Sequence, residues 1–226
     1  NSDGVHVTAS SNVFISNCYI SAGDDAIAVT GFTNAVGVDP GDGIKFAPEG
    51  LTSEVCGNGG GVCENIIVSN CMLRSRSAGI RVGYGDVPVR NCQFQHLRIN
   101  EYKRYLFFFP RDGADIEHIT FSDVTMDLRL VGGWWGHGDP LHVSSIAQNA
   151  DRPGGNIHDV RFERITARAE NGAVIWAEDP GAIQDVRLRD VDLTIHAGEH
   201  TDEFGGNFDF RPTLQMETNV FAHDIP

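Results

Sequence analysis

The sequence predicts an all-β fold, a solenoid in which a single chain coils and each coil pairs with the next. Three observations predict it. Hydrophobic residues make up 41% of the 226 residues and 26 residues are glycine, which is typical of a turn-rich β protein. Short segments of alternating apolar residues recur along the chain. Each is followed by a polar corner and a second strand, so each coil would bury its inner face against its neighbours.

Six segments carry this repeat, and they share β-branched and aromatic residues in alternation. They are NVFISNCYI (12–20), NIIVSNCML (65–73), VPVRNCQF (87–94), IEHITFSDVTM (116–126), IHDVRFERITA (157–167) and IQDVRLRDVDL (183–193). We interpret their polar corners as equivalent positions, namely Asn17, Asn70, Asn91, Asp123, Arg164 and Asp190. The intervals between these corners run from 21 to 53 residues, so the longer ones must contain loops extruded from one side of the solenoid. We expect these loops to form the walls of a cleft.

The cysteines divide into two groups. Cys18, Cys71 and Cys92 each follow an asparagine corner, which predicts an internal ladder of small apolar side chains rather than metal ligands. Cys56 and Cys63, in CGNGGGVC, could close a loop disulfide, which would favour an exported protein, secreted or periplasmic. Two reduced thiols in a loop are the alternative for this second group.

Three aspartates lie between strand-like segments within the first 29 residues. Asp3 lies in Asn1-Ser2-Asp3-Gly4, and Asp24 with Asp25 lies in Gly23-Asp24-Asp25. The 21 residues from Asp3 to Asp24 approximate one coil, so the carboxylates would stack on one face at the ~4.8 Å spacing of paired strands. Carboxylates packed in this way repel, so one should have a raised pKa and hold a proton while another stays ionised. A protonated and an ionised carboxyl side by side are the acid and the base that a glycosidase uses.

These residues resemble the Asn-x-Asp and Gly-Asp-Asp motifs of glycoside hydrolase family 28, which contains the polygalacturonases and their relatives. The resemblance implies a right-handed parallel β-helix that hydrolyses the O-glycosidic bonds of a pectic or related polysaccharide with inversion. By the same resemblance Asp24 is the general acid, and Asp3 with Asp25 holds and activates the attacking water.

The sequence departs from the family at two places. Ala78, in Ser77-Ala78-Gly79, stands where the family has the histidine of a Gly-His-Gly motif. The family's Arg-Ile-Lys motif, which grips the substrate carboxylate, has no match near Tyr105 to Phe108. We therefore interpret the chain as a divergent member, acting on a pectic or another plant or microbial glycan.

Six residues are candidates for substrate binding: Arg81, Arg104, Arg111, Trp134, Trp135 and His137. Strand alternation points the first of these outward on the aspartate face, where a guanidinium could hold a carboxylate ionised or bind a sugar oxygen. The next two arginines flank the place of the missing Arg-Ile-Lys motif. The paired tryptophans offer flat faces to sugar rings, although they could equally pack beneath their own loop. We expect the loops around Phe107–Arg111 and Trp134–His137 to wall the site.

Charge limits the partners and the substrate. The formal net charge of −14 excludes nucleic acid, and the apolar run at Leu106–Phe109 is too short to span a bilayer. The expected partner is a polysaccharide or oligosaccharide, without nucleic acid or membrane, and the protein is expected to be a monomer. A galacturonate carboxylate beside three aspartates needs a cation, because like charges ~4 Å apart repel by several kcal/mol at an effective dielectric near 20. The sugar at the cleavage subsite is therefore predicted to be neutral, or the enzyme to work from a chain end.

Other expectations concern cofactors, chain ends and alternatives. Asp39 and Asp42, in a DPGDG string, could bind calcium but suit a plain turn better, so no metal or cofactor is expected. We expect one β-helix domain over residues 1–226 that lacks its natural N-terminal coils and C-terminal end, and a structural role for Arg211 at a corner. One alternative function is a polysaccharide lyase or epimerase with calcium among the aspartates. The other is a non-catalytic glycan-binding adhesin or tailspike-like module, in which the aspartates are only turn residues.

Overall fold

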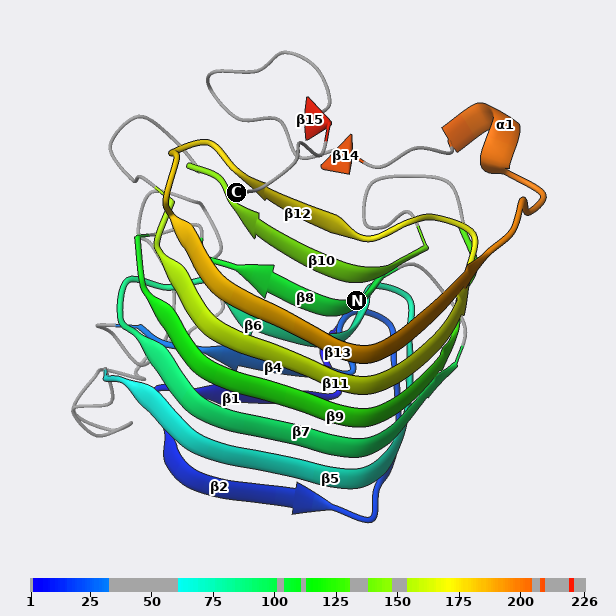
Figure 1. Cartoon of the computed structure of the whole chain (residues 1–226). Helices are drawn as coiled ribbons and strands as arrows, with labels where there is room; N and C mark the ends of the chain where they lie inside the picture. The colour runs from blue at the N-terminus through cyan, green and yellow to red at the C-terminus, as the bar shows by residue number, and fades with distance from the viewer. Residues whose placement is uncertain are drawn as a thin grey trace, which may run out of the picture.

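The computed structural model describes residues 2–32, 61–100, 104–110, 113–130, 138–147, 154–204, 208–209 and 220–221. Over these residues the chain is a parallel β-helix, in which each coil stacks on the one before (Figure 1). The all-β, single-stranded parallel β-helix expected from the sequence is confirmed. Among the residues described here, no helix is long and apolar enough to cross a membrane.

One sheet of six parallel strands begins beside the N-terminal aspartates. Its order in space is β1 (Val5–Thr8), β4 (Ile27–Thr30), β6 (Ala78–Gly83), β8 (Arg104–Phe109), β10 (Asp139–Ser145) and β12 (Val174–Ala177). Val5 lies opposite Ile27, and Ile27 lies opposite Ile80. Because successive side chains of a strand alternate between its faces, these residues point into the core and their neighbours point out.

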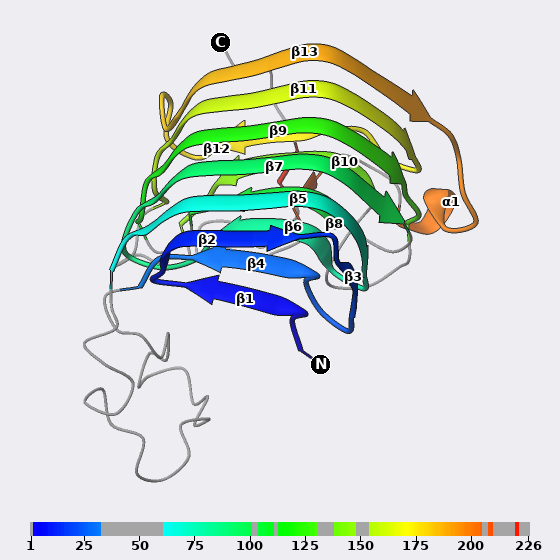
Figure 2. The same cartoon turned by 90° about the horizontal axis from the view of Figure 1, so that it is seen from below.

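A second sheet of seven strands faces the first across the core (Figure 2). It comprises β2 (Ser11–Ser16), β3 (Tyr19–Ala22), β5 (Cys63–Ser75), β7 (Val89–Asn100), β9 (Ile116–Asp127), β11 (Ile157–Ala169) and β13 (Ile183–Ile195). A short helix, α1 (Thr201–Phe204), and the antiparallel pair β14 (Phe208–Asp209) and β15 (Val220–Phe221) complete the described elements.

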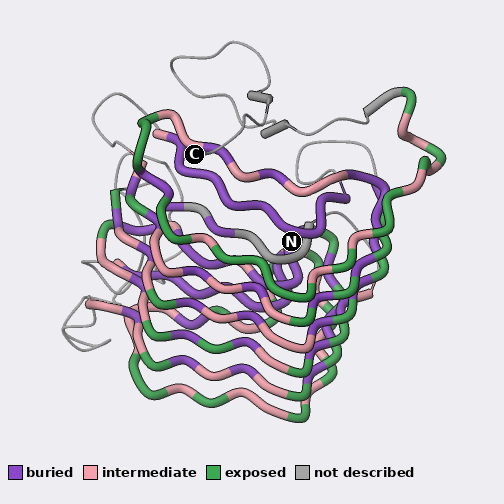
Figure 3. Tube along the Cα trace, viewed as in Figure 1, coloured by how far each residue is buried: buried purple, intermediate pink, exposed green. Residues whose placement is uncertain are grey.

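The core is a stack of apolar rows between the two sheets. Phe94, Phe121 and Phe162 lie opposite one another on β7, β9 and β11, with parallel rings whose centroids are 4.5 and 5.6 Å apart. Phe108 on β8 meets this row edge-on from the other sheet. Buried and exposed positions alternate along the long strands (Figure 3). The segment Phe107–Phe109 was expected in a loop that walls the site, and this expectation is wrong. It belongs to β8, which pairs with β6 on one side and β10 on the other.

Two columns of left-handed residues bend the long strands. The first column is Asn12, Asn65, Asn91, His118, Asp159 and Asp185, and the second is Asn17, Asn70, His96, Asp123, Arg164 and Asp190, all with φ between 50° and 58°. Asparagine, aspartate and histidine are enriched in this conformation, so polar residues recur there. The corner assignment was thus wrong for Asn91, which aligns with Asn65, whereas His96 takes the place opposite Asn70.

The corrected register also changes the cysteine ladder. Cys18 aligns with Cys71, since Tyr19 lies opposite Met72, but Cys92 lies opposite Ile119 in another row. All three face the core, Cys71 and Cys92 buried and Cys18 partly buried, so only the three-membered ladder was wrong. Cys63 is a buried free thiol 3.8 Å from the Val7 carbonyl oxygen, and its candidate disulfide partner Cys56 lies outside the described residues.

Candidate active site

Three carboxylates meet where the first two coils enter the six-stranded sheet. Asp3 precedes β1, and Asp24 with Asp25 precedes β4. The Gly4 N–H donates to the Asp25 carbonyl at 2.8 Å and the Asp24 N–H donates to the Ser2 carbonyl at 3.1 Å, so the two entry turns lie side by side. One carboxylate oxygen from each aspartate lies within 4.8 Å of the others. The structure therefore gathers the three aspartates as the coil spacing predicts.

Asp25 is the most deeply placed of the three. Its side chain is 5% exposed, and its Oδ1 accepts a hydrogen bond of 2.9 Å from the Ala78 N–H. Its Oδ2 accepts from Nε of Arg81. With both oxygens occupied by fixed donors, Asp25 is arranged to hold neighbouring groups in place rather than to meet solvent.

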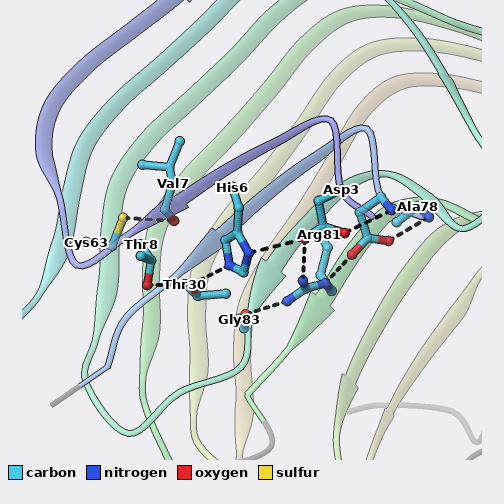
Figure 4. Close-up of polar contacts among 10 residues, drawn as sticks. Asp3, His6, Val7, Thr8, Thr30, Cys63, Ala78, Arg81 and Gly83 are labelled. Atoms are coloured by element: carbon cyan, nitrogen blue, oxygen red, sulfur yellow. Dashed lines mark hydrogen bonds and ion pairs between the residues drawn. The ribbon is translucent and has the colours of Figure 1, made fainter. Parts of the chain in front are cut away.

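Asp3 is also surrounded by donors but is less deeply buried, with a side chain 18% exposed. Its Oδ1 accepts from the Asp25 N–H at 3.2 Å, and its Oδ2 lies 3.2 Å from His6 Nδ1 and 3.5 Å from Arg81 Nη2 (Figure 4). Burial alone would raise the pKa of Asp3, but the His6 hydrogen bond and the charge of Arg81 outweigh it and lower the pKa below its ordinary value of 3.8. Asp3 is thus an ionised carboxylate over most of the acidic range.

Asp24 is shifted the other way. Burial, followed by the charges of Asp25 and Asp3, raises the pKa of Asp24 above 3.8, against a hydrogen bond from Ser77 and the charge of Arg81. Its backbone is fixed by Ser75, whose hydroxyl donates to the Asp24 carbonyl oxygen. Two interacting carboxyls with pKa values pushed apart are the signature of an acid and base pair, although their titration belongs to the group as a whole.

Arg81 lies among the carboxylates, on β6. Its side chain is 13% exposed, and Nη1 donates to the Gly83 carbonyl at 3.2 Å while the other guanidinium nitrogens face Asp25 and Asp3. Burial opposes the charge of Arg81, but Asp25, Tyr84 and Asp3 together raise its pKa. Arg81, a candidate for substrate binding, is therefore already paired with the carboxylates of Asp25 and Asp3.

The other candidates are placed only in part. Arg104 begins β8, and its backbone pairs with Ala78 on one side and Asp139 on the other, so that β6 lies between this strand and β4. The remaining candidates lie outside the described residues, as do the possible calcium ligands and the corner arginine: Arg111, Trp134, Trp135, His137, Asp39, Asp42 and Arg211.

Two residues at the site had not been singled out from the sequence. His6 lies on β1 beside Asp3, and its Nε2 is 2.9 Å from the Thr30 hydroxyl. The sequence signal that could have identified His6 is its position three residues after Asp3, at the start of an alternating, strand-like segment. Tyr84, whose ring centroid lies 4.8 Å from Arg81 Cζ, follows the end of β6 in a turn that sequence periodicity does not describe.

A second polar group lies further along the same sheet. On β10, Asp139 Oδ2 is 2.7 Å from His142 Nδ1, and His142 Nε2 is 3.1 Å from the Ser144 hydroxyl. The connectivity matches that of serine hydrolases. However, His142 and Ser144 have no exposed surface, so a substrate cannot reach this serine and the group is structural.

The carboxylate trio does not suit calcium. Calcium takes six to eight oxygen ligands, and here the oxygens of Asp3 and Asp25 accept hydrogen bonds from Arg81 and backbone N–H groups. A guanidinium among the carboxylates also repels a divalent cation. The lyase or epimerase with calcium at this position therefore finds no support in the geometry.

Comparison with known proteins places the similarity around these residues. The model of glycosyl hydrolases family 28 matches residues 1–103. A probable polygalacturonase of Arabidopsis thaliana is 39% identical over 87 residues, which cover 36% of this chain and 18% of that protein. A polygalacturonase of Prunus persica is 30% identical over 105 residues, which cover 42% of this chain and 25% of that protein. The matches thus span a quarter or less of these curated relatives, and no solved structure matches significantly.

Proposed function

We propose that this chain, whose residues 1–103 match the model of glycosyl hydrolases family 28, is a divergent member of that family and hydrolyses O-glycosidic bonds in a pectic or related polysaccharide. One observation carries the proposal. Asp24 and Asp3 have oxygens within 4.8 Å, and their surroundings shift their pKa values in opposite directions. A protonated carboxyl beside an ionised one is what general acid and base catalysis of this bond requires.

We assign the roles from the directions of these two pKa shifts. Asp24 donates its proton to the glycosidic oxygen as the C–O bond breaks and its electron pair passes to the leaving sugar. Asp3 takes a proton from the water whose oxygen attacks the anomeric carbon. The family resemblance gives Asp25 a share in holding the water, and its two oxygens, which accept fixed hydrogen bonds, also keep Arg81 and Asp3 in place. Exchange with solvent returns a proton to Asp24 and removes one from Asp3.

The stereochemical proposal rests on the family resemblance, which implies inversion. The spacing of the trio does not itself favour that outcome, because inverting enzymes usually separate the two carboxyls by ~6.5–9.5 Å to admit water. Here the nearest oxygens lie within 4.8 Å. Proton NMR of the first product anomer tests the point directly, and a retained anomer would overturn inversion while leaving hydrolysis intact.

The charge of the substrate follows from the position of Arg81. Its guanidinium is already shared by Asp25 and Asp3, so it is poorly placed to neutralise a galacturonate carboxylate as well. We therefore propose a neutral sugar at the cleavage subsite or attack from a chain end, with Arg104 and Arg111 as the remaining candidate cations. Because such polymers lie outside cells, we also propose secretion or export to a periplasm.

Release of reducing sugar from a panel of pectins and neutral or mixed glycans tests the proposal. We expect the wild-type protein to release reducing ends and Asp24→Asn to lose this activity. The same assay with polygalacturonate at low and high salt tests the substrate charge, and fast random cleavage of polygalacturonate would contradict a neutral subsite. Binding of glycans without any release of reducing ends would favour the non-catalytic adhesin or tailspike-like alternative.

A further inference from the structure

The turn that follows β6 has an unusual backbone. Gly83, Tyr84 and Gly85 have φ angles of 117°, 62° and 112°, so three successive residues are left-handed. Glycine adopts such angles freely, but a bulky aromatic residue with positive φ is an outlier. Outliers of this kind persist only where the surrounding structure fixes them, and they concentrate at functional sites.

Close packing of two strand ends fixes this turn. A Cβ on Gly85 would overlap the carbonyl oxygen of Gly31, directly after β4, and a Cβ on Gly31 would overlap the carbonyl oxygen of Val87. The Val87 N–H donates to the Gly31 carbonyl at 3.3 Å. The chain between β6 and β7 can therefore leave the sheet along this path because two glycines allow the backbones to touch.

The strained turn delivers two groups to one guanidinium. The Tyr84 ring lies under Arg81, with 4.8 Å between the ring centroid and Cζ, and it packs against the methyl group of Ala78. The Gly83 carbonyl accepts from Nη1 of Arg81 at 3.2 Å. Arg81 is thus held by an aromatic face and a carbonyl on the turn, and by the carboxylates of Asp25 and Asp3 on the other coils.

We propose that Tyr84 is a positioning residue that holds the Arg81 guanidinium against Asp25 and Asp3. It acts on the reaction through Arg81 and does not need to touch the substrate, and the inference rests on the proposed glycosidase function. A cation over an aromatic face is attracted by the ring quadrupole, and more strongly where water is partly excluded, as it is here. Without the ring, Arg81 keeps its charge but loses the surface that fixes its plane.

The charged and titratable groups around Arg81 lie on or next to three neighbouring strands, β1, β4 and β6. Among the described residues, Asp3 and His6 approach from the first coil, Asp24 and Asp25 from the second, and Tyr84 from the turn after β6. The charge of Arg81 lowers the pKa values of both Asp3 and Asp24, and Asp3, as the proposed base, reports the position of Arg81 through the acidic limb of the pH profile. If Arg81 moves away, the pKa of Asp3 rises, and the acidic limb of the pH profile moves to higher pH.

The test compares Tyr84→Gly and Tyr84→Phe with the wild-type chain. Tyr84→Gly removes the ring but also relieves the strained backbone, and because these two effects oppose each other we expect Tm to change little. We expect kcat/KM to fall about tenfold, less than the ~100-fold that a 1 Å misplacement can cost, with the acidic limb displaced upward. Tyr84→Phe keeps the ring and should match the wild type. His96→Gly is the matched control, since His96 is also left-handed (φ 53°) but lies on an exposed corner.

Several outcomes would overturn the inference. An unchanged rate and acidic limb in Tyr84→Gly would do so, and so would a fall in rate explained by a lower Tm with the limb in place. A Tyr84→Phe variant as impaired as Tyr84→Gly would implicate the hydroxyl instead of the ring. If the wild-type chain hydrolyses no glycan, the proposed function fails, and the positioning role is then read from unfolding alone. The pH at which the protein loses stability in acid should then be higher in Tyr84→Gly than in the wild type, because the pKa of Asp3 rises. An acid transition at the same pH in both would refute the role.

Discussion

Replacing Arg81 by methionine should destabilise the protein more than replacing any exposed arginine. Methionine keeps much of the side-chain length but removes the charge and all donors. Asp25, with a side chain 5% exposed, then keeps the Ala78 N–H and loses its charged partner, and Asp3 loses one of its donors. Breaking a buried ion pair from one side is costly because an uncompensated charge stays buried.

The size of the effect follows from the exposure of the partners. Removing one member of a buried pair costs about 3–5 kcal/mol. The 13% exposure of Arg81 and the 18% exposure of Asp3 place this site at the lower end of that range. A loss of about 3 kcal/mol in a chain of this size lowers Tm by roughly 6–12 °C.

The pH dependence of that loss has a defined sign. The pKa of Asp3 is lower in the folded chain than its ordinary value of 3.8, so its contribution to stability is present above that value and disappears as the pH falls through the folded pKa. Arg81→Met removes part of this contribution. The difference in Tm between the wild type and the variant should therefore be large at pH 7 and shrink below pH 3.8.

Thermal unfolding followed by circular dichroism at pH 7 and in acid measures both quantities. Arg90→Met is the matched control, because Arg90 pairs with Glu64 at 2.8 Å on the surface, with side chains 41% and 29% exposed. Exposed pairs contribute little, so this variant should change Tm far less. An Arg81→Met variant as stable as Arg90→Met, or a difference that does not shrink in acid, would refute the reasoning.

Three further predictions concern the acid, the pH profile and the turn. Asp24→Asn should lower kcat by ~10²–10⁴-fold, because it removes the proposed general acid. It should raise Tm at neutral pH, because burial and neighbouring charge raise the pKa of Asp24 and its ionised form costs stability above that pKa. A lower Tm would contradict this. The pH profile of kcat/KM should be bell-shaped, with an acidic limb below pH 3.8 from Asp3 and an alkaline limb above pH 3.8 from Asp24. A profile with a single limb would contradict the paired roles. Gly85→Ala should destabilise by more than ~1 kcal/mol, because its Cβ overlaps the Gly31 carbonyl oxygen at a φ of 112°. The control Gly181→Ala has a φ of 91° but no atom nearer than 3.9 Å, so equal losses in the two would exclude the overlap as the cause.

The sequence by itself determined the solenoid and the grouping of the three aspartates. Alternation of apolar residues specifies strands with one buried face, and polar residues at the bends specify corners, because Asn, Asp and His tolerate positive φ. Asp3 and Asp24 are separated by about one coil, and stacking coils then bring them together. Both inferences need only local patterns and the near-constant length of a coil.

The register was decided only by the tertiary structure. Asn-Cys occurs at both corner columns, at Asn70 and at Asn91, and local pattern gives no means to tell two corners that lie five residues apart in every coil. Strand pairing distinguishes the two corners, because the observed register stacks Phe94 on Phe121 in the core and places His96 opposite Asn70. A slip would move the apolar row out of the core.

The electrostatics of the site were also decided by the tertiary structure. Nothing in the sequence joins His6, Arg81 and Tyr84, which come from the first coil, the third strand of the sheet and the turn beyond it. Their contacts depend on the side-by-side placement of coils and on two glycines that let strand ends touch. The direction in which each aspartate titrates depends on those contacts and on burial, which are properties of the packed chain and not of any local segment.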